Sequence, residues 1–285
     1  MSMMVPPVKI SASDVNKLRQ ITGSGMMDCK NALVEADGDF EKAIEILRKR
    51  GLKVANKRAD MEASEGVVLA KTSNDGKLGV ILVFNCETDF VAKNTEFVSY
   101  VNSLADLALK NKSESIEIFK TVSYNEKLTV NDTIIDKVGV IGEKMDISKL
   151  EYVDAAKVFA YIHPGNRLAS LVGLNDASFS TVDETGKDIA MQIAAMGAIA
   201  VDKDDVPAET VAKELEIAKE LALKEGKPEK MLDQIAKGRL NKFFTESTLL
   251  NQEFFKDTKK TVRQFLQETQ KGLTVTAFKR FALKS

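Results

Sequence analysis

The pattern of hydrophobic and polar positions is most informative around residues 78–108. The run Leu78–Phe84 is apolar and rich in β-branched residues, which predicts a buried strand. Beyond it, apolar residues recur at the spacing of one face of an amphipathic helix: Phe97, Val101, Leu104 and Ala108. The polar stretch Asn85–Asn94 therefore lies at a junction between a strand and a helix. Such a junction can present side chains from a rigid scaffold.

Thr88, Asp89 and Phe90 occupy this junction, and the pattern leaves two interpretations open. As structural residues, Thr88 or Asp89 would cap a helix by accepting backbone N–H groups, and Phe90 would extend the apolar face of Phe97. The alternative is that the helix starts later, at Asn94. Asp89 and Phe90 would then lie off its buried face.

Three short helices are predicted at the start of the chain. Ser11, followed by Asp14, is typical of a helix start, and glycines punctuate the segment. We expect the helices over residues 11–23, 25–36 and 39–51, the third one ending before Gly51. A bundle this small buries little surface and should be marginal alone.

Two adjacent methionines in the second helix, Met26 and Met27, cannot share one narrow core stripe. Met26 lies on the face of Cys29 and Leu33, whereas Met27 lies on the side of Val34. Either the small bundle buries both, or they form an adaptable sulfur-rich contact surface.

The remainder of the chain predicts two β-hairpins of similar pattern, each followed by an amphipathic helix. The first joins Val67–Ala70 to Leu78–Phe84, and the second joins Val158–Ile162 to Leu168–Leu174. We expect a strand at Lys149–Val153 to pair with the second hairpin. His163 lies in the turn of that hairpin, a position typical of an exposed turn residue.

Further helices follow from apolar residues at helical spacing. One begins near Thr129, after a polar stretch at Lys110–Glu117, and another carries Ile189, Ile193 and Met196. Pro207 and Pro228 each open a helix, which together predict an antiparallel helical hairpin projecting from the body. A last helix and strand should contain Phe265 and Val275, respectively.

These elements predict an α+β fold with four parts. Residues 1–52 would form the three-helix module, 53–63 a charged linker, 64–145 one core subdomain and 146–285 a second. The helical hairpin 203–245 would be inserted in the second subdomain. The two similar hairpins suggest that the subdomains are related.

Composition excludes several classes of function. In 285 residues, 41 basic and 42 acidic side chains nearly cancel, so no overall field attracts nucleic acid or an anionic membrane. The first seven residues predict no signal peptide, and the weakly polar run 189–201 is too short for a bilayer. Cys29 and Cys86 lack a metal-binding spacing and fit two buried thiols in a reducing cytoplasm. With one histidine and no phosphate-binding loop, nothing demands covalent chemistry, a cofactor or a metal.

The chain contains two longer motifs, Thr88-Asp89-Phe90-Val91-Ala92-Lys93-Asn94 and the segment Thr22–Leu33, which contains Gly25-Met26-Met27-Asp28. Both resemble signatures of the elongation factor Ts family, the nucleotide-exchange factors of bacterial elongation factor Tu. Shorter segments agree in order along nearly the whole chain: Ile162–Arg167, Asp205–Pro207, Gly238–Leu240 and Thr274–Phe281.

The resemblance implies a function and a set of site residues. The N-terminal module would be of the ubiquitin-associated type. Thr88, Asp89, Phe90 and Val91 would act beside the magnesium site of elongation factor Tu, in its GDP-bound and nucleotide-free forms. Further contacts to that partner would come from Arg19, Met26, Met27 and His163. Such a protein is not an enzyme. An enzyme that uses Asp89 with a second carboxylate, and a general adaptor, are the competing hypotheses.

Overall fold

The computed structural model describes residues 9–283, so the expectation about the first seven residues lies outside the described part. The chain forms two compact units. The first contains the segments up to Val67 and Val83–Leu150, and the second contains Val68–Leu82 and Glu151–Ala282. Both combine helices with strands, which confirms the α+β class. The four-part division at residues 52, 63 and 145 stays a prediction.

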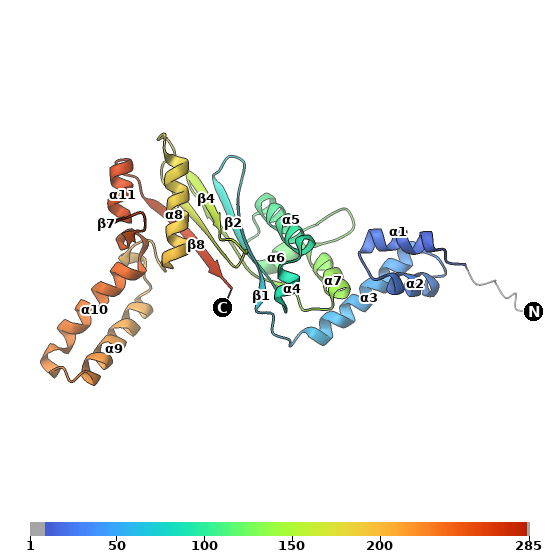
Figure 1. Ribbon diagram of the computed structural model, residues 1–285, viewed down its shortest axis with the longest axis horizontal. Helices are drawn as coiled ribbons and strands as arrows, with labels where there is room; N and C mark the ends of the chain where they lie inside the picture. Colours follow the sequence, from blue (N-terminus) through green and yellow to red (C-terminus); the bar gives the residue numbers. More distant parts are fainter. Residues whose placement is uncertain (1–8, 284–285) are drawn as a thin grey trace, which may run out of the picture. The chain divides into compact units, whose positions relative to one another are not determined.

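The first unit begins with the three predicted helices, α1 (Ala12–Thr22), α2 (Met26–Glu35) and α3 (Phe40–Arg58). Ser11 and Asp14 form a capping box at the start of α1, and Gly23 ends it with a left-handed φ of 70°. Asp39 caps α3. The three helices pack together (Figure 1). They bury a small core that includes both Cys29 and Leu33.

The sequence predicted that the third helix ends before Gly51, but α3 continues to Arg58. Gly51 lies against Gly139 of α7 (Val130–Ile141), where a Cβ at Gly51 would come within 3.1 Å of the Ile135 carbonyl oxygen. The close packing of two helix backbones offsets the low helix propensity of glycine. A pattern along one helix cannot show this partner, and the sequence alone therefore predicts a helix end at Gly51.

The remaining helices of the first unit are α4 (Asp89–Ala92), α5 (Thr95–Asn111), α6 (Ile116–Thr121) and α7. The expected apolar face of α5 is buried, and the Phe84 ring contacts the Phe97 ring edge-on at a centroid distance of 5.5 Å. Helix α6 was missed, because it begins inside the stretch that was expected to be irregular. Ser115 caps it and Phe119 anchors it in the core.

Strands β1 (Glu65–Thr72), β2 (Leu78–Cys86) and β3 (Asp146–Asp154) form a three-stranded sheet in the order β1-β2-β3. The prediction that the third of these strands joins the second hairpin is wrong. That hairpin, β4 (Lys157–Ile162) and β5 (Leu168–Leu174), pairs instead with the C-terminal β8 (Val275–Ala282). Strand pairing over such separations leaves no local trace in the sequence.

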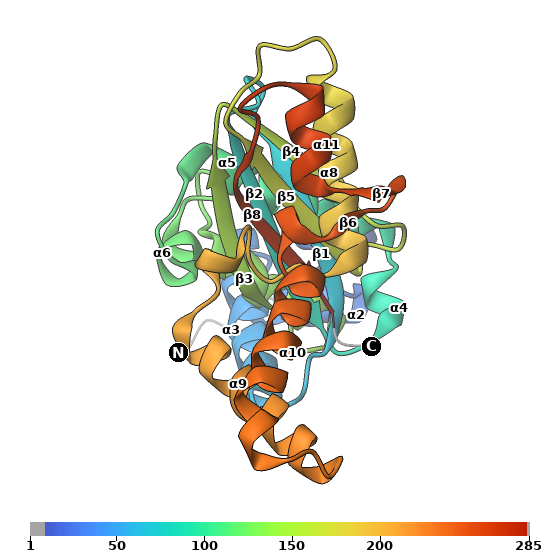
Figure 2. The same cartoon turned by 90° about the vertical axis from the view of Figure 1, so that its left-hand side faces the viewer.

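In the second unit, α8 (Val182–Met196) packs on the sheet β4-β5-β8 (Figures 1 and 2). Gly186 of α8 lies over the Phe159 ring, where an added Cβ would be only 2.0 Å from a ring carbon. Ile189 and Ile193 are buried as predicted, whereas Met196, the last residue of α8, is exposed. Short elements complete this layer: η3 (Leu249–Asn251), β6 (Glu253–Phe254), β7 (Asp257–Thr261) and α11 (Val262–Thr269).

The predicted helical hairpin is present as α9 (Ala208–Lys224) and α10 (Leu232–Ser247), preceded by the short turns η1 (Lys203–Asp205) and η2 (Glu229–Met231). The two helices lie side by side and extend away from the sheet of their own unit (Figure 2). Ion pairs join them, Arg239 to Glu225 and Lys219 to Asp233, each at 2.7 Å. No residue of 203–245 belongs to the buried cluster around α8.

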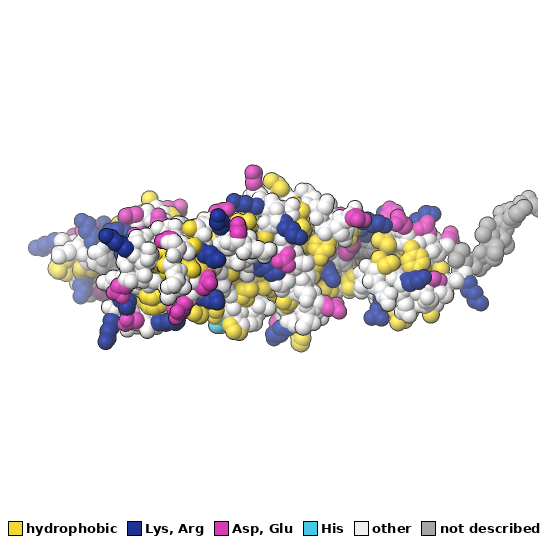
Figure 3. Space-filling view, turned by 90° about the horizontal axis from the view of Figure 1, so that it is seen from above, with side chains coloured by type: hydrophobic (Ala, Val, Ile, Leu, Met, Phe, Trp, Pro, Cys, Tyr) yellow, Lys and Arg dark blue, Asp and Glu magenta, His cyan; other side chains and the backbone are white. Residues whose placement is uncertain are grey.

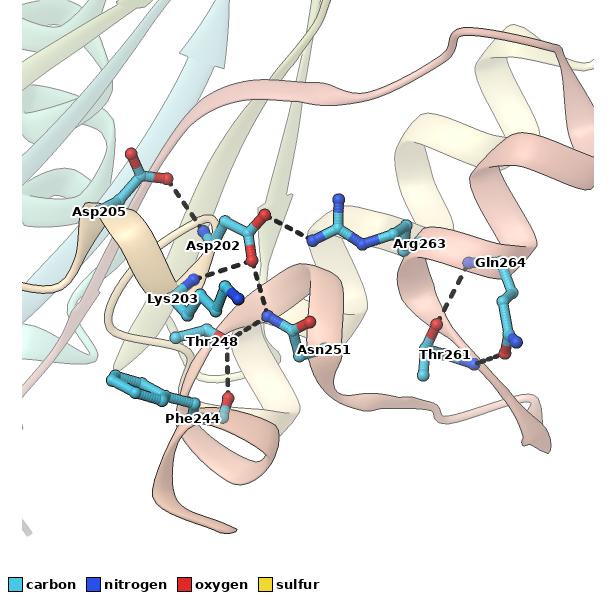
Figure 4. Close-up of polar contacts among 9 residues, drawn as sticks. All are labelled: Asp202, Lys203, Asp205, Phe244, Thr248, Asn251, Thr261, Arg263 and Gln264. Atoms are coloured by element: carbon cyan, nitrogen blue, oxygen red, sulfur yellow. Dashed lines mark hydrogen bonds and ion pairs between the residues drawn. The ribbon is translucent and has the colours of Figure 1, made fainter. Parts of the chain in front are cut away.

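The base of this hairpin is held by one carboxylate. Asp202 accepts hydrogen bonds from the backbone N–H of Lys203, the Asn251 amide and the Arg263 guanidinium (Figure 4). Asn251 also donates to the Thr248 hydroxyl at 2.8 Å, and Thr248 ends α10. Asp202 therefore joins the entry and the exit of the hairpin to α11.

Candidate functional site

The junction between strand β2 and helix α4 forms a fixed turn, which we call the Thr88 turn (Thr88–Val91). Thr88 is the N-cap of α4 in an extended conformation, and its hydroxyl oxygen accepts from the Val91 N–H at 3.4 Å. Asn94 caps α5 separately by accepting from the N–H groups of Glu96 and Phe97. The expectation of a later helix start at Asn94 is therefore confirmed.

Phe90 decides between the two interpretations of this turn. Its side chain is 84% exposed, so it does not extend the buried face of α5. Helix α4 buries none of its residues, although an isolated surface apolar residue is in itself common. Among Thr88, Asp89 and Phe90, Thr88 has the structural role, because it caps the helix. The Phe90 ring lies outside the core.

Asp89 is next to Phe90 and forms an ion pair with Lys93 one helical turn later, at 2.6 Å. The hydrogen bond from the Lys93 ammonium holds the pKa of the Asp89 carboxyl below its usual range. Asp89 is therefore ionised at neutral pH. As an exposed pair, it is screened by water and can exchange partners at little cost.

Contacts from a distant loop fix the Thr88 turn, and sequence analysis missed them. The Glu143 carboxylate accepts from the Thr88 N–H at 3.0 Å and from the Thr88 hydroxyl at 2.6 Å. The Cys86 thiol donates to the Thr88 carbonyl at 3.2 Å, and burial raises the pKa of this thiol to about 12, so it remains a donor. Nothing in the sequence pattern around Glu143 indicates this role.

The N-terminal module exposes both methionines, so the interpretation that the bundle buries them is wrong. Met26 is 55% exposed and Met27 is 64% exposed. Ile21 and Val34 are also exposed, which adds apolar surface to the same three-helix module. Arg19 is exposed in the last turn of α1. At the right of Figure 3, hydrophobic side chains gather on this module, while acidic and basic side chains are intermixed over the face shown.

His163 lies in the exposed turn between β4 and β5, as predicted. Its Nδ1 is 3.0 Å from the Tyr161 hydroxyl, which fixes the orientation of the ring beside Pro164. Gly165 and Asn166 complete the turn with positive φ angles of 90° and 56°. His163 belongs to the second unit, whereas Arg19, the two methionines and the Thr88 turn belong to the first.

Two kinds of site are not found within residues 9–283. In that range no three His, Cys, Asp or Glu side chains are grouped so that they could hold a metal ion. None of its helices combines the length and the apolar character that a bilayer crossing requires.

Comparisons with known proteins show the family of this chain. The family model described as "Elongation factor TS" matches residues 87–285, beginning one residue before Thr88. A relative from Christiangramia forsetii, named elongation factor Ts, is 47% identical over 275 residues, which cover 96% of this chain and 99% of the relative. Relatives of the same name from Flavobacterium psychrophilum and Amoebophilus asiaticus are 48% and 50% identical, over 96% and 95% of this chain and 98% of each relative. The chain therefore belongs to the elongation factor Ts family of translation elongation factors.

Proposed function

We propose that this chain is a guanine-nucleotide exchange factor that binds elongation factor Tu and promotes release of GDP during the elongation phase of translation. The observation that carries the proposal is Phe90, 84% exposed beside an ionised carboxylate on a fixed one-turn helix. A large ring left outside the core at a fixed position is available for a partner, and aromatic anchors of this kind contribute much of the binding energy at protein interfaces.

The mechanism we propose is a coupling of two binding equilibria. The factor binds the nucleotide-free partner more tightly than the GDP-bound partner, and by reciprocity GDP weakens binding of the factor by the same ratio. The chain itself makes and breaks no covalent bond. Its residues act only through their contacts with elongation factor Tu.

Asp89 and Phe90 have separate roles in this proposal. Mg²⁺ requires close placement of its oxygen ligands, so the Asp89 carboxylate beside the partner's magnesium would disturb its water shell. The Phe90 ring would enter an apolar pocket of the partner. Burial of one such ring contributes about 1.5–3 kcal/mol, which helps to offset the strain created at the phosphate end.

The other exposed residues would add affinity away from the nucleotide. Arg19, Met26 and Met27 offer a charged and adaptable apolar surface on the N-terminal module. His163 offers a polar contact in the second unit. We place this partner, and the protein, in the cytoplasm, without direct contact to nucleic acid or membrane.

The test is release of a fluorescent GDP analogue from purified elongation factor Tu. Phe90→Ala and Asp89→Ala should each slow stimulated release, and the Asp89→Ala deficit should shrink when magnesium is chelated. The double variant should lose less than the sum of the single losses, because neighbouring residues in one contact couple. Ile118→Ala is the matched control, since Ile118 is also exposed but lies on α6.

Urea unfolding of the same variants separates function from folding. An exposed side chain contributes little to stability, so Phe90→Ala should leave the free energy of unfolding within about 0.5 kcal/mol of the parent. Release rates near the parent value for all three variants would contradict the proposal.

A general adaptor is the second candidate function, supported by the exposed methionines of the module. An adaptor would bind elongation factor Tu without changing its rate of GDP release. An enzyme using Asp89 would instead turn over a small molecule in the absence of the partner. The release assay, with and without the factor, therefore separates the exchange factor from the other two functions, and a turnover assay without the partner separates the enzyme from the adaptor.

A further inference from the structure

Helix α4 presents the exposed ring, yet little within the helix itself holds it in place. It spans four residues, Asp89–Ala92, and none of them is buried. A single helical turn is unstable in water, because fixing its backbone dihedrals costs more than its few hydrogen bonds return. The position of Phe90 must therefore be fixed by contacts outside α4.

The usual source of such a contact is absent from α4. In a capping box, the third helical residue supplies a carboxylate or amide that accepts from the N-cap backbone N–H. Helix α7 has this arrangement, with Asp132 accepting from the N–H and the hydroxyl of Thr129 at 2.9 and 2.8 Å. In α4 the third residue is Val91, which has no side-chain acceptor.

Glu143 replaces the missing residue from a different loop. Its two oxygens accept from the N–H and from the hydroxyl of Thr88. These two groups correspond to the N–H and the hydroxyl of Thr129, which bond to Asp132 in α7. The hydroxyl of Thr88 is thereby oriented to accept from the Val91 N–H. The cap of α4 is therefore completed by a residue that lies just beyond the end of α7.

A second carboxylate forms the reverse contact. Glu87, which precedes Thr88, accepts from the backbone N–H of Lys144, which follows Glu143, at 2.6 Å. Each of the two loops thus holds the backbone of the other with a glutamate. Glu87 is largely buried, and its second oxygen accepts from the Arg58 guanidinium at 2.8 Å.

The same cluster reaches the end of α3. Arg58 is the last residue of α3, and the Lys144 ammonium donates to the carbonyl oxygens of Ala59 and Met61, at 2.5 and 2.9 Å. Since α3 also forms part of the N-terminal module, one continuous set of bonds connects that module to the Thr88 turn.

We propose that Glu143 and Glu87 are positioning residues that hold the Thr88 turn, and with it Phe90, in the orientation used on the partner. This inference rests on the proposed exchange function. Neither glutamate has to touch elongation factor Tu. Their effect on nucleotide release passes through the residues of the turn.

The first test uses the protein without a partner, so its result does not depend on the exchange function. Glu143→Gln replaces one acceptor oxygen with an NH₂ group, which leaves one donor of Thr88 unsatisfied. Hydrogen exchange of the Thr88 and Val91 amides should then accelerate roughly tenfold or more, because the local opening becomes easier. Asp132→Asn is the matched control, which removes the equivalent acceptor at α7 and should leave these two amides unchanged.

The second test is a double-mutant cycle on stimulated release. Glu143→Gln alone should lower the maximal release rate roughly tenfold, the order expected when a partly buried hydrogen bond to a charged group is lost. In a Phe90→Ala, Asp89→Ala background the same change should have less than about a twofold effect. Asp132→Asn should have no effect on release in either background.

The outcomes separate the two proposals. If Glu143→Gln slows release equally in both backgrounds, or leaves the Thr88 and Val91 amides as protected as before, the positioning role is refuted. If the parent protein does not accelerate release at all, the exchange function fails, and hydrogen exchange alone decides whether Glu143 holds the turn.

Discussion

The crossing of α3 and α7 is held by two glycines, and an alanine at Gly139 should disturb it. A Cβ at Gly139 would lie 2.7 Å from the Gly51 Cα and 3.4 Å from its nitrogen. Both atoms are backbone, so no side chain can turn aside to make room. One of the two helices would have to move.

The expected magnitude follows from two opposing terms. Alanine in place of a helical glycine gains about 1 kcal/mol of intrinsic helix propensity. Inserting a methyl group into a packed contact costs about 1–3 kcal/mol. Because the contact here is with backbone, the cost lies in the upper part of that range, and Gly139→Ala should lower the free energy of unfolding by about 1–2 kcal/mol.

Two further glycines calibrate this result. Gly51→Ala meets the Ile135 carbonyl oxygen at 3.1 Å and the Gly139 Cα at 3.4 Å, so its net effect should be smaller than that of Gly139→Ala. Gly238, inside α10, has nothing within 4 Å of an added Cβ. Gly238→Ala should therefore stabilise the protein by about 0.5–1 kcal/mol.

The assay is urea unfolding followed by circular dichroism, with hydrogen exchange of the α3 and α7 amides to locate the change. If Gly139→Ala were as stabilising as Gly238→Ala, the close crossing of α3 and α7 would be refuted. A loss of stability with unchanged exchange in both α3 and α7 would also contradict it, because one of these two helices must move.

Two further predictions concern the exposed elements. Met27 is 64% exposed, so Met27→Asp should weaken association with elongation factor Tu in a titration while the circular dichroism spectrum stays native. A loss of helicity would show that Met27 is part of the core. Replacing residues 203–245 with a short Gly-rich turn should leave the thermal unfolding transition of the remaining protein close to unchanged, because none of these residues belongs to the core of the second unit. Loss of that cooperative transition would show that the hairpin is part of the core.

Much of the fold could be predicted because its signals are local. Helix starts at Ser11, Asp39, Asn94 and Thr129 were identified from the residues that cap them. The features that were missed depend on distant contacts. Gly51 continues a helix because Gly139 lies against it, and α6 begins inside a polar stretch because Phe119, three residues into the helix, is anchored in the core.

The candidate site shows the same division. A strand followed by a polar junction was visible in the sequence, and so was the later helix start at Asn94. The glutamates that hold the junction were not, because Glu143 lies 55 residues from Thr88 and an isolated glutamate has no distinguishing pattern. The junction could be found from the sequence, whereas the contacts that fix its orientation needed the structure.

Phe84 and Phe90 show what this orientation achieves. Phe84 is completely buried and its ring meets Phe97 and Tyr100 edge-on, whereas Phe90, six residues later, is 84% exposed. Burial of an aromatic ring is worth about 1.5–3 kcal/mol wherever it occurs. At Phe84 that free energy contributes to folding. At Phe90 the fold does not use it, so the same amount remains for association with a partner, provided that the Thr88 turn is already in place when the partner arrives. Holding the turn in advance with Glu143 and Glu87 avoids the loss of conformational entropy that ordering a loose loop would cost on binding.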